Sequence, residues 1–597
     1  MSTSLKDAAT EVVSETAVEN SASASLNLTK NWKTIAIAAA SSISLAALVY
    51  YLYRSSAASS KGDSPESTTE PKKSKNKKRS KAKRNSSIPK PSDPQPQASD
   101  DSELENMTDE QISQLSETEK KNISQKLKGK GNKFFQAKEY QKAEALYSSA
   151  LRFDKNPIFY SNRAACYYSL QEYEKSIKDC NDALKFEPRY VKALVRRAQS
   201  YENINNLREA LYDFTTVCII EDFKNSVAST GAERVLKNLA ESEAKATIAN
   251  RQPRLPSRSF ISGYFNSFTS NGSPAVQSGD SELSQSEKDY NQALELASAK
   301  KFSESIEFVQ KAINGGISEV NTTAAADAYS LMGAFNFLKG SLDLAEKDFD
   351  TALNLNPKHC RTLYRKANML TEKKDIVAVE NLIQTALEIN PSDPEGYFQS
   401  GQVSFLKQDF DSASKKYQKA IDIDPNYVYP YIQLGVALFK LGSIEDAFQI
   451  FKSAMSKFPN RSDLFNYYGE VLAEQGGSTD AIKSFDDSIK LDKSNPLPYV
   501  NKAISTFQST GNFEVALDLI KESMNADPEC ELAIAALSQI YLQLGMFEDS
   551  LVMLRRAVEV AKSEDEMIST ITFRETTAAQ YRFIKEHPDL VSKIMNQ

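Results

Sequence analysis

Four prolines spaced 34 residues apart, Pro357, Pro391, Pro425 and Pro459, place the strongest constraint on this chain. Before each proline, three apolar residues recur with the same spacing of four and then three positions. The triplets are Ala345, Phe349 and Ala352; Val379, Ile383 and Ala386; Ala413, Tyr417 and Ala420; and Ala447, Phe451 and Ala454. This period is typical of a repeat solenoid, in which each repeat buries its apolar face only against its neighbours. The chain is therefore expected to be all-α.

A marker position in the first helix of each repeat, most often occupied by a small residue, extends the pattern beyond the prolines. The markers are Gly131, Ala164, Ala198, Ala293, Gly333, Ala367, Gly401, Gly435, Gly469, Ile504 and Ser538. Twelve residues after most of them a second small residue follows, so that two helices can approach closely. The pattern predicts a tetratricopeptide-repeat (TPR) superhelical solenoid of about eleven helix pairs.

The repeats fall into a group of three and a group of eight, separated by a break between Cys218 and Ser286. The break contains an expected helix at 233–249, three prolines, and the aromatic residues Phe260, Tyr264, Phe265 and Phe268. Two interpretations of these aromatics are open: a segment packed against the repeats, or a lid over a peptide groove. One or two further helices after Ala561 are expected to cap the solenoid.

Residues 34–53 predict one membrane span, because 20 residues without a charge are long enough to cross a bilayer. A cleaved signal peptide fits less well, since the preceding segment is long and carries four acidic residues. Ten basic residues within 71–90 follow the span. The positive-inside rule therefore places the C-terminal side in the cytosol.

Six parts are expected along the chain. They are a disordered tail (1–33), the transmembrane anchor (34–53), a basic and polar disordered tether (54–115), a three-repeat domain (116–222), a linker (223–285) and an eight-repeat domain with capping helices (286–597). The tail and tether are rich in Ser, Thr, Pro and charged residues, and they bury too little apolar surface to fold.

Charge and composition exclude several function classes. From residue 91 onward the chain has 58 basic and 72 acidic residues, a net charge of −14, which argues against nucleic acid as a partner. The five cysteines lack CxxC spacing, and the two histidines have no nucleophile nearby in sequence. We therefore expect no metal, no cofactor and no catalytic residue. Once the repeats are assigned, no stretch long enough for a catalytic domain remains.

Five polar residues are predicted to converge on the inner face of the first three repeats. Lys128 and Asn132 lie one helical turn apart in the first repeat, and Lys192 and Arg196 have the same spacing in the third. Asn162 occupies the second repeat. Three cations and two amides in one groove suit two carboxylates, which a C-terminal Asp of a peptide supplies with its side chain and chain end.

The second group has a different inner face. Tyr290, Leu294 and Leu331 occupy the positions that match three of the five polar residues of the first group, so a second set of this kind is not expected. A set of aromatic and acidic residues is expected there, suited to a basic amphipathic or extended apolar peptide. The predicted set is Phe337, Tyr364, Phe398, Phe405, Tyr431, Phe439, Glu395 and Glu470, with Asp463 and Glu474 nearby. The alternative for each of them is a place in the core between repeats.

The motifs KGKGN (128–132), YSNRAA (160–165) and KALVRRA (192–198) resemble the dicarboxylate clamp of TPR co-chaperones. That resemblance implies binding of the C-terminal Glu-Glu-Val-Asp of the 70- and 90-kDa heat-shock chaperones. Nearly the whole chain resembles the 70-kDa preprotein receptors of the mitochondrial outer membrane in their fungal form, especially at 396–441, which contains VYPYIQL (428–434).

This second resemblance implies a single-pass receptor with its N-terminus in the intermembrane space and its bulk in the cytosol. It also implies that chaperones dock on the first repeats and that precursors, notably carriers with internal signals, bind the later ones. Other subunits of the outer-membrane translocase would then receive the precursor at the import pore. Two alternatives stay open: a membrane-anchored chaperone adaptor on the endoplasmic reticulum or peroxisome, and a passive scaffold of another complex.

Overall fold

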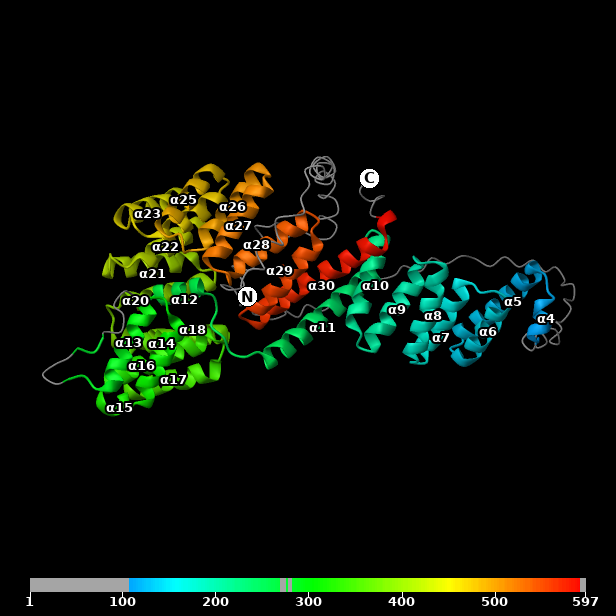
Figure 1. The fold of residues 1–597 in the computed structure, drawn as a ribbon, viewed down its shortest axis with the longest axis horizontal. Helices are drawn as coiled ribbons and strands as arrows, with labels where there is room; N and C mark the ends of the chain where they lie inside the picture. Colours follow the sequence, from blue (N-terminus) through cyan, green and yellow to red (C-terminus); the bar gives the residue numbers. More distant parts are fainter. Residues whose placement is uncertain (1–106, 269–274, 278–281, 591–597) are drawn as a thin grey trace, which may run out of the picture. The chain divides into compact units, whose positions relative to one another are not determined.

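The computed structural model describes residues 107–268, 275–277 and 282–590, which form helices and loops without a β-strand. The predicted tail, membrane anchor and most of the tether lie outside the described residues. Among the described helices, none combines the length and apolarity needed to cross a bilayer. The helices follow one another in antiparallel pairs (Figure 1). The predicted all-α TPR solenoid is therefore confirmed.

Each repeat consists of a first helix (A) and a second helix (B). The A helices are α5 (Glu117–Gln136), α7 (Pro157–Ser169), α9 (Val191–Asn203), α13 (Gln285–Ser298), α16 (Thr322–Leu338), α18 (Cys360–Glu372), α20 (Pro394–Leu406), α22 (Val428–Lys440), α24 (Ser462–Glu474), α26 (Leu497–Thr510) and α28 (Glu531–Gln543). The B helices are α6 (Tyr140–Phe153), α8 (Tyr173–Phe186), α10 (Leu207–Ile220), α14 (Phe302–Asn314), α17 (Leu342–Leu355), α19 (Ile376–Ile389), α21 (Phe410–Ile423), α23 (Ile444–Lys457), α25 (Ser478–Leu491), α27 (Phe513–Ala526) and α29 (Phe547–Val560).

The turn between A and B has the same form in all of these pairs. The residue seven positions after the marker has a positive φ in each pair, although its residue type varies. These residues are Lys138, Gln171, Asn205, Lys300, Gly340, Lys374, Gln408, Gly442, Gly476, Gly511 and Gly545. One left-handed residue ends the A helix and reverses the chain, so that the B helix runs back along it.

Close approach of A and B explains the small residues at the markers. Gly401 lies against the ring of Tyr417, and a Cβ built on Gly401 would come within 2.5 Å of that ring. Gly435 faces Phe451 and Gly469 faces Phe485 in the same way, again 16 residues apart. The aromatic residue of helix B therefore fills the space that a side chain on helix A would need.

Replacing Gly401 by valine should destabilise the chain by about 1–3 kcal/mol, because the new side chain overpacks the buried ring of Tyr417. Gly129→Val is the matched control, since a Cβ at this helical position meets no atom within 4 Å. Urea unfolding of both variants measures the difference. Equal unfolding midpoints for the two variants would contradict this packing argument.

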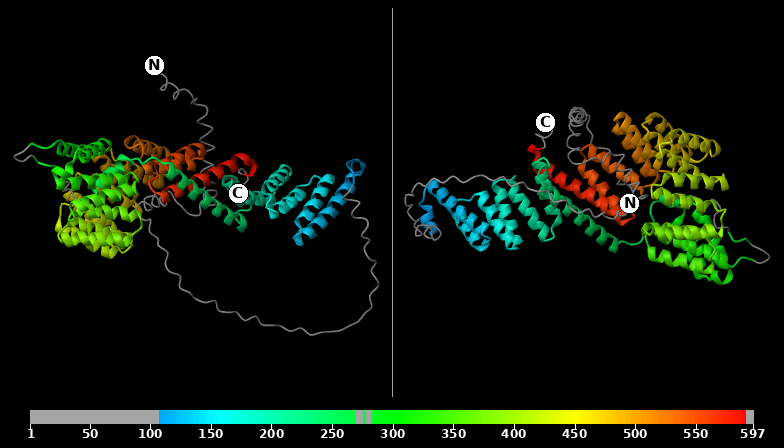
Figure 2. Two further views of the ribbon diagram at one scale, coloured as in Figure 1. Left: turned by 90° about the horizontal axis from the view of Figure 1, so that it is seen from below. Right: turned by 180° about the vertical axis from the view of Figure 1, so that it is seen from behind.

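Among the described helices, five stand outside the pairs: α4 (Asp109–Ser113), α11 (Ser226–Asn250), α12 (Arg258–Asn266), α15 (Ile317–Val320) and α30 (Glu564–Glu586). Helix α11 covers the helix expected at 233–249. Helix α30 follows the last repeat and buries Met567, Ile571 and Phe583, as a capping helix does. Figure 2 shows these helices from two further directions.

Helix α4 corrects one expectation, because it lies within the stretch 54–115 that was expected to be disordered. A capping box between Thr108 and Gln111 begins the helix. Ile112 is 6% exposed and packs into the core of the first repeat. Arg152 of α6 forms an ion pair with Asp109 at 2.6 Å. One buried side chain and one ion pair thus fix a short helix in a segment of polar composition.

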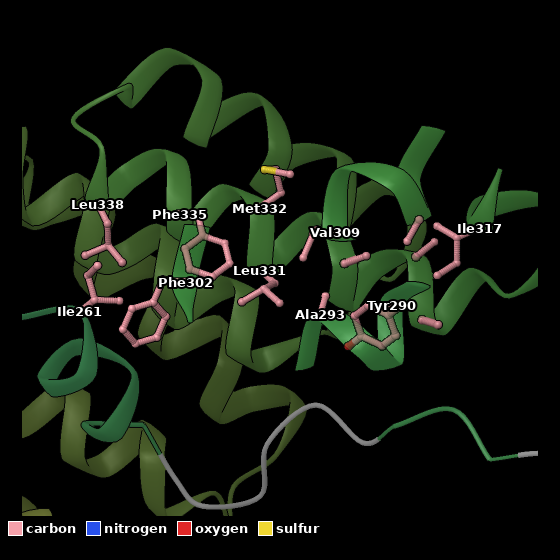
Figure 3. Packing of buried hydrophobic residues seen from close by; sticks show 14 residues of the cluster. Ile261, Tyr290, Ala293, Phe302, Val309, Ile317, Leu331, Met332, Phe335 and Leu338 are labelled. Atoms are coloured by element: carbon pink, nitrogen blue, oxygen red, sulfur yellow. The ribbon is translucent and has the colours of Figure 1, made fainter. Parts of the chain in front are cut away.

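The described chain divides into two compact units, one ending at Leu239 and the other beginning at Ala240, within α11. The first unit contains the three-repeat group, and the second contains the eight-repeat group. The core of the second unit begins with a cluster around Tyr290, Phe302 and Phe335. Figure 3 shows that Ile261 of α12 joins this cluster beside Phe302 and Leu338.

Candidate peptide-binding sites

The A helices α5, α7 and α9 bring the predicted clamp residues of the first unit together. Asn162 Nδ2 on α7 donates a hydrogen bond to Asn132 Oδ1 on α5 at 3.4 Å. Arg196 Nη1 on α9 donates to the main-chain carbonyl of Ser161 on α7 at 2.9 Å. Successive A helices therefore lie side by side, with Asn132 and Asn162 in contact between them. That Lys128 and Lys192 face the same groove stays a prediction.

The orientation of Asn132 is set by a residue of helix B. Tyr147 on α6 donates its hydroxyl to Asn132 Oδ1 at 2.7 Å, and Asn162 donates to the same oxygen. With the carbonyl oxygen held by two donors, Asn132 presents its amide N–H groups to a ligand. An amide that donates suits a carboxylate, which only accepts hydrogen bonds when ionised.

The three cations of the groove keep their charge available. Lys192 is exposed, while Lys128 and Arg196 are half-buried. In the described part of the chain, Lys128 contacts the Gln125 side chain and Arg196 a main-chain carbonyl, and neither forms an ion pair. Burial lowers the pKa of Arg196, but an arginine remains charged at neutral pH. Among the described residues, no carboxylate of this chain therefore neutralises Lys128 or Arg196, which suits them to a carboxylate ligand.

The arginines next to the clamp behave differently, and sequence inspection missed their role. Arg163 holds Asp179 through two hydrogen bonds of 2.7 and 2.8 Å. Arg197 holds Asp213 in the same manner at 2.8 and 2.7 Å. Both aspartates are almost fully buried. Each pair joins helices A and B of one repeat, and the recurrence of Arg and Asp after 34 residues is the signal that could have found it.

The residues predicted for the second groove separate into two classes. Tyr364 and Phe398 are 1% exposed and Glu395 is 3% exposed, so these three lie in the core. The remaining five are half-buried: Phe337, Phe405, Tyr431, Phe439 and Glu470. Tyr364 donates its hydroxyl to Asp393, and Phe398 packs edge-on against Tyr427. Tyr364 and Glu395 thus belong to the core between repeats, while Phe398, although almost fully buried, also lines the pocket described next.

A cavity of about 900 Å³ lies inside the second unit. Its lining includes residues of α12, Tyr429 and Gln433 of α22, Asp463 and Tyr467 of α24, and residues around the start of α28 and α30. Arg461 and Tyr429 both bond Asp463 across one wall. Polar and aromatic groups from several repeats thus face one internal space, which is large enough to hold several side chains of a peptide.

Glu470 links two A helices of the second unit. Its Oε1 accepts hydrogen bonds from Asn466 on the same helix and from Asn501 on α26, each at 2.7 Å. Removal from water raises the pKa of Glu470 to about 7, although the two amide donors act in the opposite direction. A carboxyl group that titrates near neutrality therefore lies at the junction of two repeats.

Glu470 should make the free energy of unfolding fall as the pH rises from about 4.5 to 7. The reason is that the folded chain holds the Glu470 proton more tightly than the unfolded chain does. The contribution of this group is up to about 3 kcal/mol, with the larger stability at the acid end. Glu470→Gln should remove this part of the pH dependence. Urea unfolding of both proteins at pH 5 and pH 8 measures it. An unchanged pH dependence in the variant would contradict the assignment.

The chain is similar to TPR repeats and to a subunit of mitochondrial import receptors. Models of the tetratricopeptide repeat match residues 157–190, 401–442 and 431–461. Human mitochondrial import receptor subunit TOM70 is 28% identical over 492 residues, covering 78% of this chain and 80% of the human protein. The same-named subunit of Saccharomyces cerevisiae is 35% identical over 127 residues, 21% of each chain. The crystal structure of yeast Tom70 covers 80% of this chain and 100% of its own, with a TM-score of 0.51 and 26% identity.

Proposed function

Because this chain is a homologue of the mitochondrial import receptor subunit TOM70 over most of its length, we propose that it is a non-enzymatic receptor for precursor proteins at the mitochondrial outer membrane. The observation that carries the proposal is the match over 78% of the chain, which spans both groups of repeats rather than a single TPR segment. A short TPR match alone would indicate only a peptide-binding module.

The first unit supplies a dock for cytosolic chaperones. Its groove presents two amides, Asn132 and Asn162, and three cations, Lys128, Lys192 and Arg196. A C-terminal aspartate offers two carboxylates within a few ångströms of each other, and Arg196 is able to bond one of them through two N–H groups. The ligand in this proposal is the Glu-Glu-Val-Asp end of the 70- and 90-kDa heat-shock chaperones.

The second unit supplies the binding site for the precursor, notably for carriers with internal signals. The internal cavity and the half-buried aromatic residues Phe405, Tyr431 and Phe439 are its recognition surface. Docking of the chaperone raises the local concentration of its cargo, so that transfer to the second unit becomes an intramolecular step. The precursor then passes to the import pore and the other translocase subunits.

Residues 34–53 anchor the receptor in this proposal, with a single pass, the N-terminus in the intermembrane space and the repeats in the cytosol. Imaging of a C-terminally tagged chain beside a mitochondrial outer-membrane marker tests the location. Coincidence of the two signals is the expected result. A reticular or separate punctate pattern would instead support the alternative, a chaperone adaptor on the endoplasmic reticulum or peroxisome.

A further inference from the structure

The segment 251–268, which joins α11 to α12 and ends just after α12, has an unusual composition for a linker. It contains three arginines, four serines and four aromatic residues, and it has no acidic residue. Part of it forms the nine-residue helix α12. Amphipathic, arginine-rich, serine-rich and acid-poor sequences are characteristic of mitochondrial targeting peptides. The receptor therefore carries within its own chain a segment with the composition of a ligand.

The apolar face of this segment is docked on the repeats of the second unit. Ile261 is 2% exposed and lies beside Phe302 and Leu338 (Figure 3). The ring of Phe265 packs 5.3 Å from that of Phe335 on α16, and Phe268 is 5% exposed. One short helix thus buries its aromatic side as an amphipathic peptide does in a groove.

The polar contacts of the segment reach distant repeats. Arg254 forms an ion pair with Glu529 at 3.2 Å, and the Ser259 N–H donates to Asp527 at 2.9 Å. At the other end, Tyr427 donates its hydroxyl to the carbonyl of Ser267 at 2.6 Å. The segment thus contacts residues next to α22, α28 and α29 that lie up to 310 positions away in sequence.

The position of Arg365 shows which surface the segment covers. Arg365 lies 35 residues after Ser330 and donates to its hydroxyl at 3.1 Å. Arg196 likewise donates to the serine 35 residues before it, Ser161, but to the main-chain carbonyl. Arg365 is therefore the counterpart in the second unit of the clamp arginine. Its guanidinium is covered by the rings of Phe265 and Phe268, at 5.8 and 5.6 Å.

We infer that residues 251–268 act as an internal substitute for a precursor's targeting helix, occupying the groove of the second unit until a precursor displaces them. The inference rests on the proposed function for the identity of the displacing ligand, an amphipathic helix with arginines on one side and aromatic or aliphatic residues on the other. The 900 Å³ cavity, lined by α12 itself, is the part of the groove that the segment leaves unfilled.

Internal occupancy has a consequence for selectivity. A tethered competitor acts at an effective concentration of about millimolar, and it lowers the apparent affinity of every free ligand by the same factor. The competitor thereby sets a minimum affinity for binding: at a given concentration a weakly matching helix does not displace it and a tightly matching helix does, although the ratio of their affinities is unchanged. Replacement of the anchor residues of α12 should raise the affinity for all ligands.

The test uses the full chain purified in detergent and a fluorescent synthetic peptide with the sequence of residues 251–268. Phe265→Ala weakens the docking of residues 251–268 on the repeats and leaves the groove and the probe intact. It should therefore tighten probe binding about tenfold or more relative to the wild type. Val377→Ala, which removes an exposed apolar side chain on α19 outside the lining of the cavity, is the control and should bind as the wild type does. Equal affinities in all three proteins would overturn the inference.

Hydrogen–deuterium exchange keeps the test decisive if Phe265→Ala folds poorly. A saturating concentration of the probe should raise the exchange of the α12 amides in the wild type, because the internal helix leaves its site. Unchanged α12 exchange at saturation would overturn displacement. A precursor peptide that fails to bind even when α12 is released would count against the proposed function alone, since displacement by the chain's own sequence would still hold.

Discussion

Replacing Arg196 by alanine is expected to weaken binding of a Glu-Glu-Val-Asp peptide by at least about 30-fold, because loss of one partner of a hydrogen-bonded charge pair costs about 2–5 kcal/mol. Arg196 is the half-buried cation of the groove, held by the carbonyl of Ser161 on the neighbouring A helix. Its position is therefore fixed before the ligand arrives, and a lysine would not reproduce its two-pronged contact. Calorimetric titration of the full chain measures the effect.

Lys178→Ala is the matched control for this experiment, because Lys178 is an exposed cation on the B helix α8. It should leave the affinity unchanged while removing the same formal charge. Added salt should weaken wild-type binding, since the contacts are ionic. Similar affinity in wild type and Arg196→Ala would contradict the assignment of the clamp.

Replacing Asp213 by alanine should destabilise the first unit by about 3–5 kcal/mol, because the substitution leaves Arg197 as a buried cation without its carboxylate. The relevant energy is the cost of the unpaired charge rather than the net value of the pair. Thermal unfolding followed by circular dichroism measures the loss. In a chain with two units, the transition of the first unit should move to lower temperature, while the transition of the second unit should stay unchanged.

Asp182→Ala serves as the comparison for Asp213→Ala, since Asp182 pairs with Lys185 at the surface of α8. Exposed pairs of this kind contribute about 0–1 kcal/mol. The two aspartate variants should therefore differ by several degrees in the unfolding temperature of the first unit. A shift of equal size in both would contradict the structural role given to the Arg197–Asp213 pair.

The regular part of this fold could be predicted from the sequence because every repeat gives the same position the same environment. A small residue at a marker such as Gly435 predicts the close contact with Phe451, and the turn residue seven positions later has a positive φ throughout. The five clamp residues are assigned from the same regularity, and their binding of a peptide stays a prediction. Their registers in α5, α7 and α9 place them on one face before any tertiary contact is known.

The irregular part could not be predicted from the period. The contacts of α12 join residues as distant as Ser267 and Tyr427, and no spacing rule relates them. Tyr364 is a core residue because it packs in one cluster with Phe268 and Tyr264 of this segment. Phe398 is buried instead by Tyr417 and Tyr427 of the neighbouring helices. Of the two interpretations of the aromatic segment, packing against the repeats is confirmed, and a lid over a peptide groove stays a prediction.

Import of a carrier precursor into mitochondria that lack this chain tests the central claim most directly. The account predicts that import of a chaperone-delivered carrier slows several-fold without the chain, that the wild-type chain restores it, and that Arg196→Ala restores it only in part. Import of a precursor that needs no chaperone should change much less. An unchanged rate of carrier import in mitochondria without the chain would contradict its assignment as a precursor receptor.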